Sequence, residues 1–562
     1  MLRKVNLVNV SLVVIILCCI VGCKGKHTVK EKEIVKTPKE MNMEVADNIK
    51  SVLQFAEENN GKINDSIGLS LYGIVNSFYD QNHFESIWSN KEMWLPRADS
   101  MFNFIKNSKY YGLYPQDYHF KELDILRKKI ASDSIARMDA ISWTKADLML
   151  TDAFMKTLKD LKEGRLVPDS VSIISKNNYI DSFFIKNLND IKNTNEIAAL
   201  LASVEPSNND YQSLRHALKG FVDNMDTSVY PILNYPYTDT LYFIKTLNKR
   251  LSQSGISFDS GIVPNNATLI KEIKKYQEKN HLTVDGKAGP EMVNSINFTD
   301  NEKFKTIAIN LDRYKLLPPL PSSYLWVNLP GFYLKLVNND SVIITSKVIV
   351  GKPSTPTPLL TSEISNMVTY PTWTIPASII KKDILPELKK DPGYLEQKGF
   401  SLVDYKGDII NPFSIKWSKY SNDIPWKVVQ GSGAENALGI FKFNFNNPYS
   451  VYLHDTNQRY LFSNSNRALS HGCVRVQKWE DIAFFIARRD SMDMKSHNNI
   501  AYTVDSIKTW IAQKSRKRIM VKNRLPLFIE YYTCSTKNNK IIFYDDIYDE
   551  DKDFAQTYFS NK

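Results

Sequence analysis

The spacing of apolar residues divides the chain into a helical first half and a strand-rich second half. From about residue 46 to 250, apolar positions recur every three or four residues, which is the period of helices that bury one face. Two clear stripes are Ile67, Leu71, Ile74, Val75 and Phe78, and Leu148, Ala153, Phe154, Leu158 and Leu161. Gly112, Gly164 and Pro168 interrupt the pattern and are expected at turns. The pattern therefore predicts a helical domain over residues 46–255.

A short unit at 262–298 has its own pattern of turns and helices. A helical stripe ends near Gln277, an Asp-Gly pair at 285–286 indicates a tight turn, and a second helix follows Pro290. This order resembles the small three-helix peptidoglycan-binding domain, in which Gln is followed by Leu-x-Val-Asp-Gly-x-x-Gly-Pro. The resemblance implies glycan binding, and a structural spacer without glycan affinity is the alternative.

From about residue 323 the apolar period changes to two, the alternation typical of β-strands. Runs of this kind lie at 324–329, 332–337, 342–344, 348–350, 439–445, 450–453, 519–521 and 527–534. The segment 364–430 interrupts them, is rich in Pro, Lys, Trp and Tyr, and is expected to cover a sheet as a lid or subdomain. Helices are expected at 479–488 and 505–514.

The N-terminus carries an export pattern. Two basic residues precede a nearly unbroken apolar run at 10–21, which fits a secretory signal peptide and is short for a membrane span. The run ends in the sequence IVGC at 20–23, which resembles the lipobox of bacterial lipoproteins. That resemblance implies lipidation of Cys23 and anchoring to a membrane, with an uncleaved signal anchor as the alternative. Residues 24–45, rich in Lys and Glu, are expected to form a flexible tether.

The net charge limits the classes of partner that are expected, and the cysteine content bears on disulfides. The formal net charge of +11 would suit an acidic cell-wall polymer or an anionic lipid surface, or it reflects only a solvated basic surface. The sequence has no RNP, zinc-finger or basic-zipper pattern, so nucleic acid is not an expected partner. Of the five cysteines, only Cys473 and Cys534 lie outside the N-terminal segment, so no disulfide framework is expected. Cys534 is expected to be a buried apolar residue in a strand.

The string Ser470-His471-Gly472-Cys473, with His454 on the strand before it, carries the candidate chemistry. Acyl transfer from an amide needs a thiolate, a base that generates it and donors for the oxyanion. Cys473 is the candidate nucleophile. His454 is the candidate base, which would raise the fraction of Cys473 present as the reactive thiolate. Ser470 is expected to hold His471 or His454 by a hydrogen bond. Gly472 is expected to let its own N–H and that of Cys473 point at one oxygen. A zinc site is the competing interpretation, but one thiolate and two histidines leave its ligand set incomplete.

These residues closely match the signature of the L,D-transpeptidase catalytic domain, also called the YkuD domain. Arg475 stands where the signature usually has Asn, which resembles the large periplasmic branch of the family. The segments that resemble the same branch are Gly351-Lys352, Thr357-Pro358, 370–376, 436–442 and 452–456, and upstream Phe78-Tyr79, Ile87-Trp88, Gly112-Leu113, 117–119 and Gly164-Arg165. The loop 430–433 departs from the pattern, because a proline is expected there.

The resemblance implies a mechanism. The Cys473 thiolate would attack the carbonyl of the third residue of a peptidoglycan stem peptide, release the terminal D-alanine and pass the acyl group to an amine of a second stem. His454 would be the general base, and His471 would support the loop. Arg475 would bind a substrate carboxylate or form an internal salt bridge. Further candidates for substrate binding are Tyr370, Trp373 and Tyr452. The residues alone support only a thiol acyltransferase or hydrolase.

The predicted architecture is multidomain α+β, with a helical scaffold domain, a three-helix peptidoglycan-binding domain and a mainly β catalytic domain with a capping insert. The predicted ranges are signal peptide 1–23, tether 24–45, scaffold 46–255, peptidoglycan-binding domain 262–298, catalytic domain 323–535 with insert 364–430, and C-terminal tail 536–562. No cofactor or metal is expected. The expected location is the periplasmic side of the cell envelope, and carbapenem β-lactams are expected covalent inhibitors. The alternatives are an L,D-carboxypeptidase or cysteine hydrolase on the same substrate, and a non-catalytic peptidoglycan-binding protein.

Overall fold

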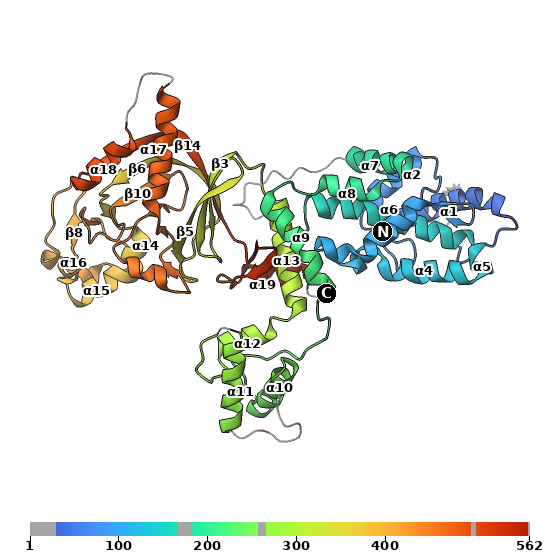
Figure 1. Ribbon diagram of the computed structural model, residues 1–562, viewed down its shortest axis with the longest axis horizontal. Coiled ribbons are helices and arrows are strands. Elements are labelled where there is room, and N and C mark those ends of the chain that lie inside the picture. Colours follow the sequence, from blue (N-terminus) through green and yellow to red (C-terminus); the bar gives the residue numbers. More distant parts are fainter. Residues whose placement is uncertain (1–29, 167–180, 257–265, 281, 496–501, 560–562) are drawn as a thin grey trace, which may run out of the picture. The chain divides into compact units, whose positions relative to one another are not determined.

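A computed structural model describes residues 30–166, 181–256, 266–280, 282–495 and 502–559 (Figure 1). The chain forms two compact units, of which the first comprises residues up to 103, 118–156 and 180–197, and the second comprises the remaining segments. The expected signal peptide and lipidation site Cys23 lie outside the described residues. Within the described ranges, none of the helices combines the length and the apolar character that a membrane span requires.

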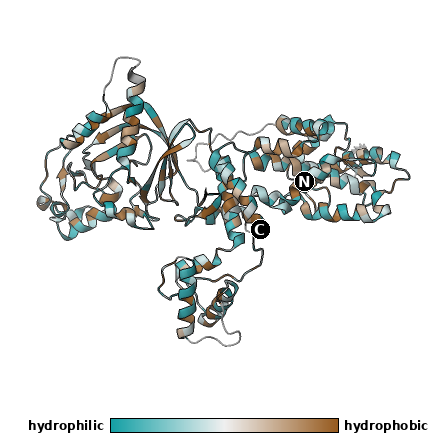
Figure 2. Cartoon of the chain, in the orientation of Figure 1, coloured by the Kyte–Doolittle hydropathy of each residue, from teal (hydrophilic) through white to brown (hydrophobic). Residues whose placement is uncertain are grey.

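The first half of the chain is almost entirely helical. Its helices are α1 (Pro38–Glu58), α2 (Tyr72–Gln81), α3 (Pro96–Lys106), α4 (Phe120–Ser132), α5 (Ser134–Arg137), α6 (Ala140–Lys162), α7 (Asp181–Thr194), α8 (Ile197–Val204), α9 (Asn209–Asp223), α10 (Thr240–Gln253), α11 (Asn266–Lys279), α12 (Pro290–Asn297) and α13 (Asp300–Lys315). A two-residue pair, β1 (Ser89–Asn90) and β2 (Met93–Trp94), interrupts them. Most of these helices carry both hydrophobic and hydrophilic residues in Figure 2, as expected of helices that bury one face.

The tether prediction for 24–45 is wrong over its second half. Helix α1 begins at Pro38, and Met41 and Val45 on it are buried. Ahead of the helix, Val35 is buried, and its N–H donates to the carbonyl of Met138 at 2.9 Å. The few apolar residues among the charges are therefore spaced to bury one face of a helix.

Helix α6 provides a polar anchor in the first unit. The carboxylate of Asp147 is buried on this helix and accepts hydrogen bonds from the Tyr79 hydroxyl at 2.5 Å and the Trp88 N–H at 3.1 Å. The Trp88 indole donates to Thr151 at 2.8 Å. Because a buried carboxylate must be satisfied, these bonds fix the segment after α2 against α6. They account for Tyr79 and Trp88, which belong to two of the upstream segments that carry the resemblance.

A buried charge cluster has the same role in the second unit. Asp312 on α13 accepts from Arg165 Nε and from Lys315 Nζ, each at 2.8 Å, and both Asp312 and Lys315 have fully buried side chains. The Arg165 guanidinium also donates to the carbonyl of Gly112 at 2.9 Å. Gly164 has φ of 74°, and a Cβ there would lie 3.2 Å from the Asp312 side chain, so glycine is required.

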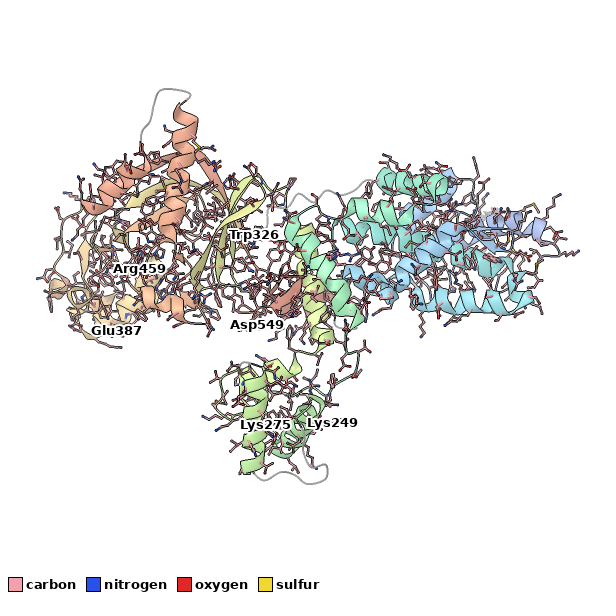
Figure 3. All side chains as sticks on the ribbon, viewed as in Figure 1. Lys249, Lys275, Trp326, Glu387, Arg459 and Asp549 are labelled. Carbon is pink, nitrogen blue, oxygen red and sulfur yellow. The ribbon has the colours of Figure 1, made fainter. Side chains whose placement is uncertain are left out.

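Helices α10, α11 and α12 share one hydrophobic core, which includes Phe243 and Leu247 of α10. The three-helix module therefore begins before residue 262, and the prediction that assigned α10 to the scaffold is corrected. The turn is fixed by Gln277, whose side-chain Nε2 donates to Asp285 at 2.8 Å and whose Oε1 accepts from the Gly286 N–H at 2.9 Å. Figure 3 labels Lys249 on α10 and Lys275 on α11 of this module.

The remaining elements build the β-rich part of the second unit. The strands are β3 (Ser323–Asn328), β4 (Tyr333–Asn338), β5 (Ser341–Gly351), β6 (Leu360–Thr369), β7 (Trp373–Thr374), β8 (Phe400–Val403), β9 (Lys427–Gln430), β10 (Phe441–Phe445), β11 (Leu453–His454), β12 (Ala468–Ser470), β13 (Val474–Val476), β14 (Lys517–Glu530), β15 (Cys534–Lys537) and β16 (Lys540–Phe543). The helices are α14 (Ala377–Ile379), α15 (Leu385–Lys390), α16 (Tyr394–Gln397), α17 (Trp479–Lys495), α18 (Val504–Ala512) and α19 (Glu550–Phe559).

Nine strands form the main sheet, in the order β12-β5-β13-β11-β10-β6-β14-β3-β4. Because β4 also pairs with β5, the sheet curls back on itself. One face packs against α17, where Trp479 stacks on Phe441 with ring centroids 4.8 Å apart. Figure 1 shows α17 and α18 beside this sheet. The mainly β architecture predicted for the C-terminal domain is confirmed.

The capping insert is a small subdomain with its own core. Its three-stranded antiparallel sheet has the order β7-β9-β8, and its core includes Ile384, Leu388 and Trp417. The predicted start at 364 is too early, because β6 runs through Thr369 as a strand of the main sheet.

Residues after 535 are not a tail. Strands β15 and β16 form a hairpin, and α19 follows it. Phe543 and Phe559 pack in the same core as Phe304 of α13.

Candidate active site

Three adjacent strands, β10, β11 and β13, bring the candidate residues onto one face of the sheet. Lys442 of β10 lies opposite His454 of β11, which in turn lies opposite Arg475 of β13. Because side chains alternate along a strand, Tyr452 and Cys473, each two positions before one of these residues, belong to the same face. The intervening residues Phe441, Phe443, Leu453 and Val474 are buried in the core on the other face.

The surroundings of Cys473 favour the neutral thiol over the thiolate. Burial raises its pKa above the ordinary value, and this effect exceeds four opposing influences. Those are the backbone N–H and the hydroxyl of Tyr452, which approach the sulfur, and the positive charges of Lys442 and Arg475. The residue as a whole is half-buried.

His454 is a buried, neutral imidazole. Its exposure is 4%, and burial, followed by the charge of Arg475, lowers its pKa to about 3. The backbone groups of Asp455 and Leu438 lie against the ring as hydrogen-bond acceptors and oppose this shift. Nδ1 has no hydrogen-bond partner among the described residues, so these acceptors favour a proton on Nε2. The Nδ1 lone pair is therefore free to accept a proton.

The loop before Cys473, the candidate nucleophile, is held by Ser470, but not in the predicted way. Its hydroxyl donates to the carbonyl of Cys473 at 2.6 Å and accepts from the N–H of Gly472 at 3.1 Å. The expectation that Ser470 holds His471 or His454 is wrong, because its short side chain bonds to its own loop.

The Gly472 N–H is consequently occupied, which corrects the predicted oxyanion hole. Gly472 has φ of 113°, which is why glycine stands there. Among the described groups, the Cys473 N–H meets no acceptor. Besides this N–H, the backbone N–H and the hydroxyl of Tyr452 are donors that approach the sulfur.

A second layer of residues supports the loop from behind. The buried hydroxyl of Thr357 donates to the carbonyl of Gly472 at 2.8 Å and accepts from the N–H of Gly351 at 2.9 Å. Tyr548, near the C-terminus, donates its hydroxyl to the Gly351 carbonyl at 2.7 Å and accepts from the Thr357 N–H at 3.2 Å. A Cβ on Gly351 would lie 2.2 Å from the carbonyl oxygen of Thr355, so this residue must be glycine.

His471 faces the capping insert. Its Nε2 lies 2.9 Å from a carboxylate oxygen of Asp383, which belongs to a short π-helix, Ile380–Ile384. His471 is 38% exposed and Asp383 is 47% exposed, so the pair is solvated. His471 thus links the loop to the insert.

The other candidates for substrate binding differ in their contacts and in their burial. Arg475 donates from Nη1 to Gln458 at 3.1 Å, and among the described residues it forms no internal salt bridge. Trp373 of the insert packs on Phe400, and its indole N–H approaches the Tyr452 hydroxyl without completing a hydrogen bond. Tyr370 is buried, with 8% exposure, at the end of β6.

The side chain of Asp455 supports the turn before β10. It accepts from the Ile440 N–H at 3.1 Å and pairs with Arg459, labelled in Figure 3, at 2.9 Å. Within the described ranges, no three His, Cys, Asp or Glu side chains are grouped to hold a metal ion.

Comparison with known proteins identifies this part of the chain. Residues 322–493 match the model of the L,D-transpeptidase catalytic domain. The chain therefore contains an L,D-transpeptidase catalytic domain. Residues 74–218 match the Scaffold domain, so the resemblance drawn from His454 and the loop 470–473 is confirmed at the level of the family.

The chain is also similar to a curated protein. A curated Haemophilus influenzae protein named "Putative L,D-transpeptidase" is 34% identical over 246 residues, which are 44% of this chain and 48% of that protein. The chain thus spans about half the length of this curated relative.

Two solved structures are also similar in part. One is the catalytic domain of an E. faecium L,D-transpeptidase acylated by ertapenem, 12% identical, with 38% of this chain and 100% of that chain covered and a TM-score of 0.17. The other is a carbamoyl enzyme of Ldtfm with avibactam, 11% identical, with 41% and 63% covered and a TM-score of 0.17.

The sequence analysis missed Lys442, Thr357 and Tyr548 as parts of this site. Lys442 stands between Phe441 and Phe443 in a strand pattern, which indicates only that it faces away from the core. Thr357 was noted within a motif but without a partner. Tyr548 lies far from the motif in sequence, and the residues around it do not predict its contact with Gly351 and Thr357.

Proposed function

We propose that this protein catalyses L,D-transpeptidation of peptidoglycan, with Cys473 carrying the stem peptide as a thioester. The observation that carries the proposal is the neutral, buried His454, whose unpartnered Nδ1 belongs to the same face of the sheet as the half-buried Cys473 thiol. A match to the L,D-transpeptidase catalytic domain over these strands supports the choice of substrate.

The first half-reaction forms the thioester. His454 Nδ1 takes the thiol proton as Cys473 Sγ attacks the carbonyl of the third stem residue. The oxyanion that forms receives hydrogen bonds from the Cys473 N–H and the Tyr452 hydroxyl. When the carbonyl re-forms, the C–N bond breaks, and the proton on His454 passes to the departing amine of D-alanine.

The second half-reaction forms the cross-link. An amine of a second stem attacks the thioester carbon and gives a proton to His454. The thiolate leaves and recovers that proton from the imidazole, so the enzyme returns to its resting state. Water in place of the amine would give the L,D-carboxypeptidase reaction through the same intermediate.

The proposal extends to location. A signal peptide at 1–23 with a lipid on Cys23 would deliver the enzyme to the periplasmic side of the cell envelope, where stem peptides are found. The three-helix module of α10 to α12 would add glycan affinity. A non-catalytic binding protein is the rival role, and the complete set of Cys473 and its supporting loop favours catalysis.

The test is product analysis with a stem tetrapeptide muropeptide. Wild-type protein should release D-alanine and form a dimer detectable by mass, and Cys473→Ser should form neither product while keeping its melting temperature, because an alkoxide is far harder to generate than a thiolate. Cys534→Ala is the matched control, since the buried Cys534 has no part in the chemistry. Monomer products that have lost only D-alanine would support the hydrolase instead.

A carbapenem should acylate the same sulfur. Ring opening by the thiolate leaves the drug tethered through a thioester, which intact-protein mass spectrometry detects as one adduct. Peptide mapping should place it on Cys473. A folded protein that gains no adduct, or gains one on Cys534, would contradict the assignment of the nucleophile.

A further inference from the structure

Lys442 is a cation at the edge of the thiol site, and no anion among the described residues pairs with it. Its Nζ lies 3.6 Å from the ring centroid of Tyr452, whose hydroxyl approaches Cys473. No carboxylate of the described residues lies within 4.0 Å of this ammonium. Burial lowers the pKa of Lys442, and a Cys473 thiolate opposes that shift.

Arg475 is a second cation in the same situation. Its Nη1 reaches only the neutral amide of Gln458, and its buried Nε has no hydrogen-bond partner among the described residues. Burial also lowers the pKa of Arg475, with the Cys473 thiolate again opposing. The two cations lie on β10 and β13, on either side of His454.

The carboxylates of Asp455 and Asp383 have other partners and do not neutralise Lys442 or Arg475. Asp455 is paired with Arg459 and accepts from the Ile440 N–H. Asp383 is paired with His471. Lys442 and Arg475 are both half-buried, and holding a cation partly out of water without an anion costs free energy even where, as for Lys442, an aromatic ring lies against it. Two such cations beside one sulfur therefore indicate that a ligand supplies the negative charge.

We propose that Lys442 is a specificity residue that, together with Arg475, binds a free carboxylate on the acyl donor beside the carbonyl that Cys473 attacks. This inference rests on the proposed function and specifies which acyl donors the site accepts. The donors selected are those whose departing residue ends in a free carboxylate, and a donor with that group amidated is disfavoured. The contact between the two cations and the carboxylate strengthens binding of the donor before Cys473 attacks its carbonyl.

Two alkylating reagents of nearly equal size test the charge preference directly. Iodoacetate carries a carboxylate and iodoacetamide does not, and both alkylate the Cys473 sulfur with loss of iodide. The ratio of their rate constants at Cys473, read by peptide mapping of the full chain and divided by the same ratio for free cysteine, measures the attraction. We expect about a tenfold preference for iodoacetate in the wild type, decreasing as salt is added.

Variants locate the source of the preference. Lys442→Met should reduce the ratio to near that of free cysteine, Lys442→Arg should keep most of it, and Lys540→Met, at an exposed lysine of β16, should leave it unchanged. A wild-type ratio equal to that of free cysteine would overturn the proposal. So would a Lys442→Met variant in which both reagents slow by the same factor, because Lys442 would then act only on the thiolate.

Donor peptides give an independent measurement. With a stem tetrapeptide and its C-terminal amide, the wild type should favour the free acid about tenfold in KM, and Lys442→Met should remove that difference by weakening the acid alone. If neither donor reacts, the proposed function fails, while the alkylation ratio still reports on the carboxylate site. A retained acid preference in folded Lys442→Met would contradict the role of this lysine.

Discussion

At rest, Cys473 and His454 should be a neutral thiol and a neutral imidazole, not an ion pair. The pKa of His454 is lowered to about 3 by burial and by Arg475, so at pH 7 only about one ring in ten thousand is protonated. Burial raises the pKa of the Cys473 thiol above the ordinary value of about 8.5 to 9. Both shifts disfavour charge separation, so the thiolate should form only as a substrate carbonyl is attacked.

The perturbation that tests this is pH, and the assay is alkylation of Cys473 by iodoacetamide. If the thiolate is the reactive form and its pKa is high, the rate should rise about tenfold per pH unit from about pH 6 to 8.5, without a plateau. The ultraviolet absorbance of a thiolate, taken as the difference between wild type and Cys473→Ser, should be absent at pH 7. A plateau beginning below pH 7, or a thiolate absorbance at neutral pH, would refute this account of the pair.

The support of the loop gives two further predictions. Ser470→Ala should leave the buried Gly472 N–H without an acceptor, lower stability by about 1–3 kcal/mol in a thermal melt, and slow acylation, whereas Ser470→Thr should recover part of both. Gly472→Ala should also cost about 1–3 kcal/mol, from backbone strain alone, because φ is 113° and the nearest atom to the new Cβ is 3.5 Å away. An unchanged melting temperature in either alanine variant would mean that the loop relaxes freely.

The candidate nucleophile, Cys473, and the candidate base, His454, could be predicted because their residue types and spacing lie in short segments of the sequence. His454 ends a strand, Cys473 follows a glycine turn, and adjacent strands then bring them together. The partner of Ser470 could not be predicted, because a short hydroxyl can bond either to a neighbouring side chain or to its own backbone. Only the loop geometry decides between these.

The predicted end of the scaffold domain was wrong, and the role of Lys442 was missed, for a related reason. Apolar residues of α10 have the same helical spacing as those of the scaffold, so the sequence does not indicate that they pack with α11 and α12. The face of Lys442 has the alternation of an ordinary exposed strand, and strand periodicity does not distinguish solvent from a site where cations accumulate. In both cases the information lies in contacts between segments far apart in the chain.

The hydroxyl of Tyr548 bears on where the gene can be cut for protein production. The matched family segment stops at residue 493, but the carbonyl of Gly351 and the N–H of Thr357 are held by a side chain beyond that point. Strand β14, which pairs with both β6 and β3 in the middle of the sheet, also lies beyond it. An expression fragment that ends at the family boundary would lose a central strand and the support behind the Cys473 loop. A fragment meant to keep this site intact must run at least past Tyr548.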